Sequence, residues 1–85
     1  MIKELLNNRN AIIVQLNGDN REEFLRQAKV ESFVWCTGDK IHITDNIFFN
    51  VIVFKNKAIA NLSMQTYKNS LIFQSLEKVA YKKTD

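Results

Sequence analysis

The chain has no proline and only two glycines, Gly18 and Gly38. Proline ends helices and interrupts central strands, and glycine supplies backbone angles for sharp turns. Their scarcity predicts regular elements joined by few tight turns. Hydrophobic residues make up 46% of the 85 positions and include nine aromatic residues, namely six Phe, two Tyr and one Trp. This composition excludes a disordered segment, and the length leaves room for one core, so we expect a single domain over residues 1–85.

The scarcity of cysteine limits the cellular setting. Cys36 is the only one, which excludes an internal disulfide framework and favours a reducing cytoplasm. The first residues contain one lysine and too short an apolar run for a signal peptide. No stretch approaches the ~18 apolar residues of a membrane span. We therefore expect a cytoplasmic protein that does not contact a membrane.

The chain is equally poor in catalytic residues. His42 is the only histidine, and it lies between Ile41 and Ile43 in a pattern that predicts exposure to solvent. Cys36 neighbours Trp35 and alternates with Val34, which predicts a buried, unreactive thiol of raised pKa. One cysteine and one histidine cannot close a zinc site, and no acidic cluster has calcium-loop spacing. We expect no enzymatic activity, no metal and no cofactor.

The charge is mildly basic, with a net value of +3 and a pI near 9.2. Twelve basic residues are interleaved with nine acidic ones, apart from a C-terminal group of Lys78, Lys82 and Lys83. Nucleic-acid-binding domains usually carry a denser basic stripe on one face. The charge therefore permits an anionic partner without requiring one.

The first half of the chain predicts helices at residues 2–9 and from about 20 to 31, with a buried strand at 11–16 between them. Asp19 with Glu22, or Asn20 with Glu23, has the spacing of a capping box at the start of the second helix. Residues 32–37 and 40–44 each predict a strand, the second of them half-exposed.

The second half begins with residues 48–54, the most hydrophobic segment. Its apolar residues occupy both alternating positions, which predicts a central strand covered on both faces. A tight turn at 55–57, with Asn56 at positive φ, leads to a strand at 58–62. Ser63 is expected to cap one long helix, 64–82, whose buried stripe includes Tyr67, Leu71 and Leu76. The fold class is α+β: a small two-layer domain with a mainly antiparallel sheet of four or five strands, two or three helices and the order α-β-α-β-β-β-β-α.

Three features are candidates for binding. The first is the turn from Trp35 to Lys40 around Gly38, in which Trp35 is either a core anchor or a partly exposed contact for a partner. A pocket near Trp35 could also hold a small ligand. The second is the surplus apolar surface of 48–54. If the helices cover only one sheet face, either Phe48, Ile52 and Phe54 or the opposite set must be hidden by a partner or by a second copy. Alternatively, the terminal helices lie on opposite faces of the sheet.

The third candidate is a sheet face that binds nucleic acid, where aromatic residues lie beside lysines. Phe48, Phe54, Lys55 and Lys57 fit this pattern loosely. The glycine- and aromatic-containing signature of RNA-recognition motifs is absent.

A wider pattern spans residues 20–68. A capped helix with Phe24-Leu25 precedes Phe33-x-Trp35-x-x-Gly38, and the apolar strand, the tight turn and Tyr67 follow. This arrangement, together with the abundance of Asn, Lys and Ile, resembles small accessory proteins of phages and prophages in AT-rich bacteria. The resemblance implies a protein that binds and modulates a host or defence component, or sequesters a small ligand, and it assigns no catalytic residue. The mild positive charge departs from the strongly acidic DNA mimics among such proteins.

From the sequence we therefore expect a non-enzymatic interaction protein, a phage-type inhibitor or adaptor that binds a host or bacterial protein, either as a monomer or as a homodimer. The alternative is a small nucleic-acid-binding module. The candidate binding residues are Trp35, Gly38, Lys40, Phe48, Ile52, Phe54, Lys55 and Lys57.

Overall fold

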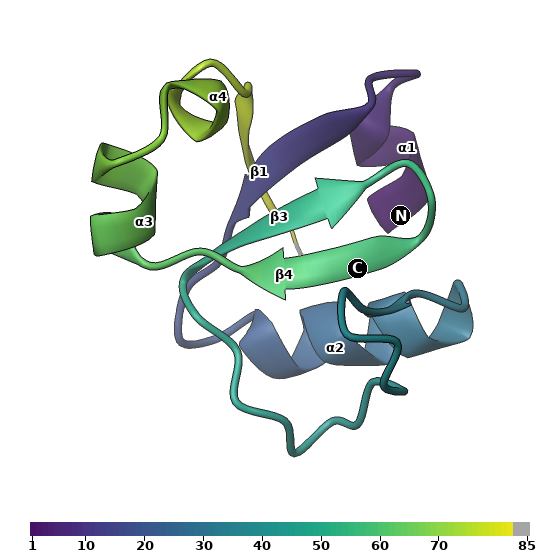
Figure 1. The fold of residues 1–85 in the computed structure, drawn as a ribbon. Coiled ribbons are helices and arrows are strands. Elements are labelled where there is room, and N and C mark those ends of the chain that lie inside the picture. Colours follow the sequence, from purple (N-terminus) through teal and green to yellow (C-terminus); the bar gives the residue numbers. More distant parts are fainter. Residues whose placement is uncertain (83–85) are drawn as a thin grey trace.

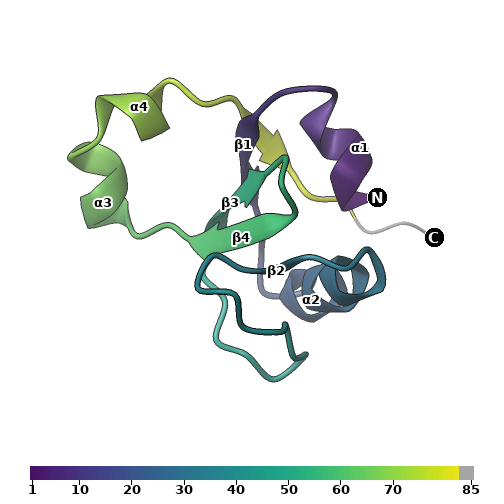
Figure 2. The same cartoon turned by 45° about the vertical axis from the view of Figure 1, so that its right-hand side comes forward.

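The computed structural model describes residues 1–82 and shows a five-stranded sheet with helices on both sides (Figures 1 and 2). The elements in chain order are α1 (Ile2–Leu6), β1 (Ala11–Gln15), α2 (Arg21–Val30), β2 (Val34–Trp35), β3 (Asn50–Phe54), β4 (Ala58–Asn61), α3 (Met64–Lys68), α4 (Leu71–Gln74) and β5 (Lys78–Ala80). The α+β class predicted from the sequence is confirmed.

The spatial order of the strands is β2-β4-β3-β1-β5. The three central strands β4, β3 and β1 are antiparallel neighbours. The sequence predicted a mainly antiparallel sheet and the pairing of β3 with β4, but not the place of β1 beside β3. The two short edge strands differ, because β5 runs parallel to β1 and β2 runs parallel to β4. Both edges are formed by segments that reach the sheet from a distance in the sequence.

The register of β1 and β3 creates two separate cores. Ile12 pairs with Val53 and Val14 pairs with Val51, and these side chains meet α1 and α2 on one face. Neighbouring strand residues point to opposite faces, so Ile13 and its partner Ile52 enter a second, smaller core on the other side, where Leu62 joins them. Strand β3 is thus covered on both faces, as its composition predicted, and Figure 2 shows α3 and α4 opposite α1 and α2.

The predicted helix over residues 64–82 is wrong. Residues 64–68 and 71–74 form two short helices, and 78–80 form β5. The hydroxyl of Ser70 accepts a hydrogen bond from the backbone N–H of Phe73 at 3.1 Å, which caps a new helix within the predicted one. Beyond α4 the backbone of Glu77 and Tyr81 bonds to β1 at 2.9 Å. Pairing with an open strand edge replaces helix formation there.

The predicted strand at 40–44 is also absent, since only Lys40 forms an isolated bridge to Val34. The predicted order of elements is therefore corrected to α-β-α-β-β-β-α-α-β. Helix α1 ends at Leu6, before Asn7 and Asn8 take the left-handed φ values of 47° and 65°. The β3–β4 hairpin forms as expected, but the positive φ of 75° falls on Lys57 instead of Asn56.

The expected capping box is not formed either. Asn20 is the N-cap residue of α2, but its side chain makes no cap hydrogen bond. It is buried, and it donates to the backbone oxygen of Tyr81 at 2.8 Å while accepting from the N–H of Asn17 at 2.8 Å. The side chain of Tyr81 packs edge-on against Phe24, with ring centroids 5.2 Å apart. These contacts hold the segment after β5 against the first core.

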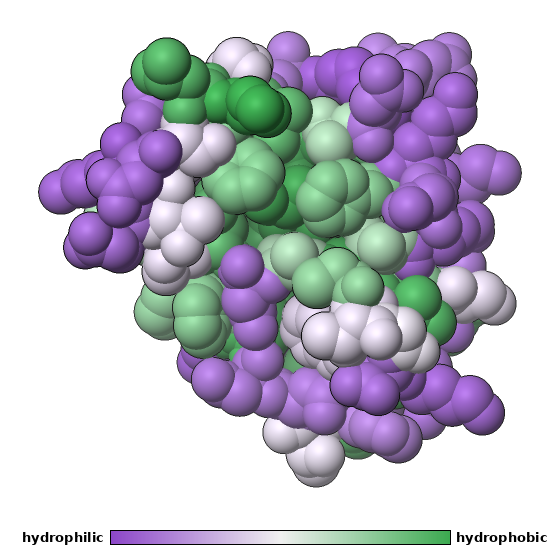
Figure 3. Space-filling view, in the orientation of Figure 1, coloured by the Kyte–Doolittle hydropathy of each residue, from purple (hydrophilic) through white to green (hydrophobic). Residues whose placement is uncertain are grey.

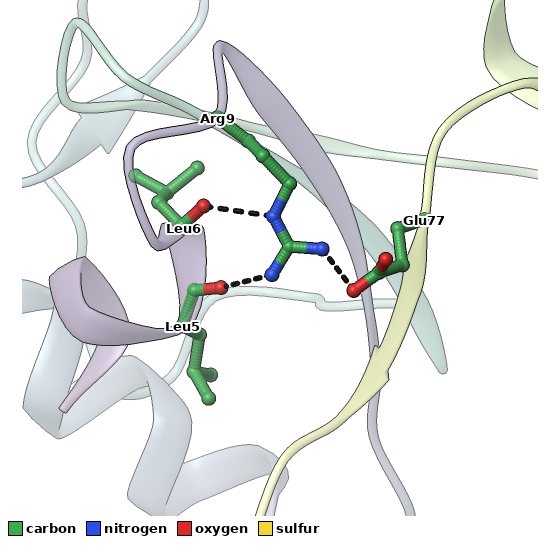
Figure 4. A network of polar contacts seen from close by, with 4 residues as sticks. All are labelled: Leu5, Leu6, Arg9 and Glu77. Atoms are coloured by element: carbon green, nitrogen blue, oxygen red, sulfur yellow. Dashed lines mark hydrogen bonds and ion pairs between the residues drawn. The ribbon is translucent and has the colours of Figure 1, made fainter.

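Arg9 forms a second link to the same segment. Its guanidinium donates to the backbone oxygens of Leu5 and Leu6, each at 2.9 Å, at the end of α1, and it pairs with the carboxylate of Glu77 immediately before β5 (Figure 4). The bonds to Leu5 and Leu6 satisfy carbonyls that a helix end leaves open. One side chain thus closes α1 and positions β5.

Glu31 closes the other end of α1. Its carboxylate accepts hydrogen bonds from the backbone N–H groups of Ile2 at 2.9 Å and Lys3 at 2.8 Å, and from the side chain of Gln27 at 2.6 Å. Partial burial raises the pKa of the Glu31 carboxyl, but the bonds from Lys3, Gln27 and Ile2 together outweigh it and hold the pKa below its ordinary value of 4.5. Glu31 therefore links the end of α2 to the start of α1.

Replacing Glu31 should destabilise the fold in a pH-dependent way. Glu31→Gln removes the charge and leaves one acceptor oxygen, so at pH 7 the free energy of unfolding should fall by about 1 kcal/mol, as for loss of a helix cap. Because the pKa is lowered in the folded state, the stabilisation is present above pH 4.5 and is lost as the pH falls through the folded-state pKa. Urea unfolding measured from pH 7 to pH 3 should show the free energies of unfolding of the wild type and of Glu31→Gln converging as the pH falls. Glu22→Gln, at an exposed carboxylate on the same helix, is the control, and a constant difference for Glu31→Gln would contradict the assignment.

Candidate functional site

The eight candidate residues lie in several separate places. Trp35, Gly38 and Lys40 belong to the turn after β2, and Phe48 is exposed in the loop before β3. Ile52 is buried in the second core, and Phe54 is half-buried at its edge. Lys55 and Lys57 lie in the β3–β4 hairpin turn. The structure thus offers two regions for comparison, the turn around Trp35 and the surface over the second core.

Trp35 supports the long loop that joins β2 to β3. The side chain is half-buried against the first core, and its indole N–H donates to the carboxylate of Asp45 at 2.7 Å. The same carboxylate accepts from the backbone N–H of His42 at 2.8 Å. Gly38 has a φ of +94°, which favours glycine, and its N–H donates to the backbone oxygen of Trp35 at 2.8 Å. This favours the interpretation of Trp35 as an anchor for local structure.

An open hollow of about 500 Å³ lies beside this turn. It is lined by Trp35, Asp39, Lys40, His42, Asp45, Asn46 and Asn61. Several polar groups in it are already engaged. Besides Asp45, the Asn61 side chain accepts from the N–H of Phe48 at 2.8 Å and donates to the oxygen of Asn46 at 3.1 Å. These bonds hold the loop to β4, so Asp45 and Asn61 serve the structure of the loop itself.

The Trp35–Asp45 contact has an optical readout, because Trp35 is the only tryptophan. The hydrogen bonds from the Trp35 indole and from His42 hold the pKa of the Asp45 carboxyl below its ordinary 3.8. Emission from Trp35 should therefore change with an inflection below pH 3.8, as protonation weakens the bond. Asp45→Ala should shift the emission at pH 7 and abolish this inflection, with far-UV circular dichroism reporting whether the fold persists. An unchanged emission maximum in Asp45→Ala would contradict the contact.

The second region is the surface over the second core, here called the open face. It consists of apolar side chains that are exposed or half-buried around Ile13, Ile52 and Leu62, namely Ala11, Phe54, Met64, Tyr67, Leu71, Ile72, Phe73 and Leu76. Figure 3 shows hydrophobic atoms running from α4 across the front of the sheet, with hydrophilic atoms on both sides. Neither α3 nor α4 contains a buried residue.

The exposure on α3 and α4 is large. Leu71 is 84% exposed, Ile72 is 74% exposed and Met64 is 62% exposed. Helices of four and five residues are too short to be stable without packing. Here α3 rests on the second core through Tyr67 and α4 through Phe73, with Leu76 following α4, and the two helices present their other apolar side chains to water. Leu71 was predicted to be buried on a long helix, and the break at Ser70 explains why it is not.

A cavity of about 180 Å³ opens beneath α3. Its apolar lining comes from both the sheet and the helix, and includes Ile13, Leu62, Met64 and Tyr67. Its polar lining includes Gln15, Asn50, Ser63 and Lys78. The ammonium of Lys78 lies 4.5 Å from the centroid of the Tyr67 ring, a cation–π contact at the rim. The cavity thus combines an apolar floor with a positively charged rim.

The residues considered for nucleic-acid binding do not form one surface. Phe48 precedes β3 and Phe54 ends it, so the strand separates them. The Lys57 ammonium donates to the backbone oxygen of Glu31 at 2.8 Å and lies 5.1 Å from the centroid of the Phe33 ring. Lys57 therefore helps to close the end of α2, whereas Lys55 is exposed. Of the C-terminal lysines, Lys83 lies outside the described residues.

From the sequence, Met64 and Ile72 were not identified as parts of the open face. Nor was Asp45 identified as the acceptor of the hydrogen bond from the Trp35 indole. Ser63 and Ser70 lie seven positions apart, and each caps the start of a short helix. This pair of serines was the local signal from which two helices could have been predicted in place of one. The prediction of a buried Cys36 is wrong, because its side chain is exposed beyond the two-residue strand β2. His42 is exposed, as predicted.

Within residues 1–82, no three side chains of the His, Cys, Asp or Glu type lie close enough to share a metal ion. No helix in the same range has the length and hydrophobicity needed to cross a membrane. Comparisons with protein-family models, curated proteins and solved structures found no match.

Proposed function

We propose that the protein is a non-enzymatic interaction protein, an inhibitor or adaptor that binds a partner protein through the open face. The observation that supports this most directly is the exposure of Leu71 and Ile72 on a helix without a buried residue. Exposed apolar surface on a folded chain carries a cost in water and marks sites of association. The second core beneath it supplies a firm base for such a contact.

The open face is better suited to this role than the turn around Trp35. At the turn, Asp45 and Asn61 are engaged in hydrogen bonds within the chain. At the open face, apolar side chains surround a cavity, which is the arrangement in which single residues contribute most to protein–protein affinity. The resemblance to phage and prophage accessory proteins suggests that the partner is a host or bacterial protein.

Replacing Leu71 and Ile72 tests this proposal. A Leu71→Ser, Ile72→Ser variant should retain its stability, because both side chains are exposed, and should bind the partner at least tenfold more weakly, which corresponds to about 1.4 kcal/mol. The partner is the protein that the immobilised wild-type chain retains from a bacterial extract, and its affinity is then measured by calorimetry with the purified pair.

Val30→Ser is the matched control, since Val30 is 76% exposed on α2, on the other side of the sheet. It should bind as the wild type does. If the Leu71, Ile72 double variant binds with undiminished affinity, the open face is not the binding surface. Light scattering of the isolated chain measures whether a homodimer uses the same residues.

The second candidate is a nucleic-acid-binding module, favoured by the excess of lysines in residues 55–82. The bond from Lys57 to Glu31 weakens it, because that ammonium already has a partner. If it is correct, a fluorescent single-stranded oligonucleotide should bind with an affinity that falls steeply with salt, and Lys55→Gln should lower that salt slope by about one. Absence of anisotropy change at low salt would eliminate it.

A further inference from the structure

The cavity beneath α3 has the size of one side chain. Its volume is about 180 Å³, whereas pockets for drug-sized ligands are commonly about 300–1,000 Å³. A cavity of about 150 Å³ is sufficient for a single benzene ring. The apolar lining, with Ile13 and Leu62 at its base, therefore suits one aromatic or aliphatic side chain.

The rim of the cavity provides groups that could bind a peptide backbone. Gln15 and Asn50 are register partners at one end of the β1–β3 pair, and both line the cavity. Each side-chain amide has donors and an acceptor, so the pair matches the N–H and C=O groups that flank an inserted side chain. A lipid chain would leave these amides without hydrogen-bond partners, which carries a cost on burial.

The segment that supplies α3, α4 and β5 carries a net positive charge, and one of its lysines, Lys78, lies at the open face. Residues 55–82, which form β4, α3, α4 and β5, contain five lysines and one glutamate and carry a net charge of +4. That glutamate, Glu77, is paired with Arg9. Residues 1–54 contain six basic and seven acidic residues and have a net charge of −1. Lys78 brings this positive charge to the cavity rim.

From these features we infer that the open face binds an acidic segment of the partner protein, which inserts one apolar side chain beneath α3 and places a carboxylate beside Lys78. This inference rests on the function proposed above and specifies the partner's chemistry. A second copy of the chain is a poor occupant, because a symmetric contact would offer Lys78 no carboxylate from residues 55–82 other than Glu77, which is paired with Arg9.

Two capped pentapeptides that differ only in charge test the inference. The acidic probe is Asp-Glu-Phe-Glu-Asp, and the neutral probe is Asn-Gln-Phe-Gln-Asn. Titration of the ¹⁵N-labelled full chain should shift the amide signals of Ile13, Asn50 and Tyr67 at millimolar peptide. The acidic probe should bind about fivefold more tightly at low salt, as expected for one exposed ion pair, and this advantage should disappear at high salt.

The Lys78→Gln variant should bind both peptides with the affinity of the neutral one. Lys55→Gln, which removes an equal charge from the hairpin turn, is the matched control and should retain the preference. Equal binding of the two peptides by the wild type, or shifts that map away from the cavity, would overturn the inference. A third contrary result is that the chain binds phosphatidylglycerol vesicles but neither peptide, and that the Leu71→Ser, Ile72→Ser variant no longer binds the vesicles. A fourth is that the chain forms a dimer and that the same two substitutions dissociate it.

The same variants separate this inference from the function on which it rests. If capture of the partner protein requires Leu71 and Ile72 but is unchanged by Lys78→Gln and by salt, the open face binds a protein. In that case the inference that the bound segment is acidic is wrong. If capture is indifferent to Leu71 and Ile72, the proposed function itself fails.

Discussion

Strand β1 is the element on which the other parts of the structure depend. Its edges pair with β3 in antiparallel register and with β5 in parallel register. Its side chains alternate between the two cores, with Ile12 and Val14 in the first and Ile13 in the second. Helices α1 and α2 lie on one side of the sheet, and α3 and α4 lie on the other (Figure 2). Ile13, almost fully buried between β3 and β5, thereby forms the base of the open face.

The two cores have unequal roles. Among residues 1–82, the first contains fifteen buried residues and receives α1, α2 and Tyr81, so it carries most of the stabilisation from apolar burial. The second contains three buried residues and a margin of half-buried ones. A small core of this kind can hold α3 and α4 in place without burying them, which is the condition for keeping Leu71 and Ile72 at the surface. One core thus provides most of the stability and the other supports the exposed surface, because alternate side chains of β1 and β3 point to opposite faces of the sheet.

Much of the fold could be predicted where the signal was local. The two-sided burial predicted for residues 48–54 holds for 50–54, whereas Phe48 and Phe49 are exposed in the loop before β3. The hairpin after this strand was readable from a short polar turn. The C-terminal region could not be read in this way, because helical periodicity competes with pairing of 78–80 to a strand more than sixty positions earlier. The same holds for the site. Trp35 and Phe54 were recognised as candidates, but Asp45 and the exposure of Leu71 depend on contacts or breaks that no short window contains.

The pairing of β5 with β1 also constrains how the chain is made. Until residues 78–80 have been synthesised, β1 has one unpaired edge, although α3 and α4 precede β5 in the chain and are made before it. An open strand edge beside apolar side chains favours pairing with other chains. The newly made polypeptide is therefore open to pairing with other chains through β1 until β5 is in place, and the ion pair between Arg9 and Glu77 helps to hold β5 at that edge.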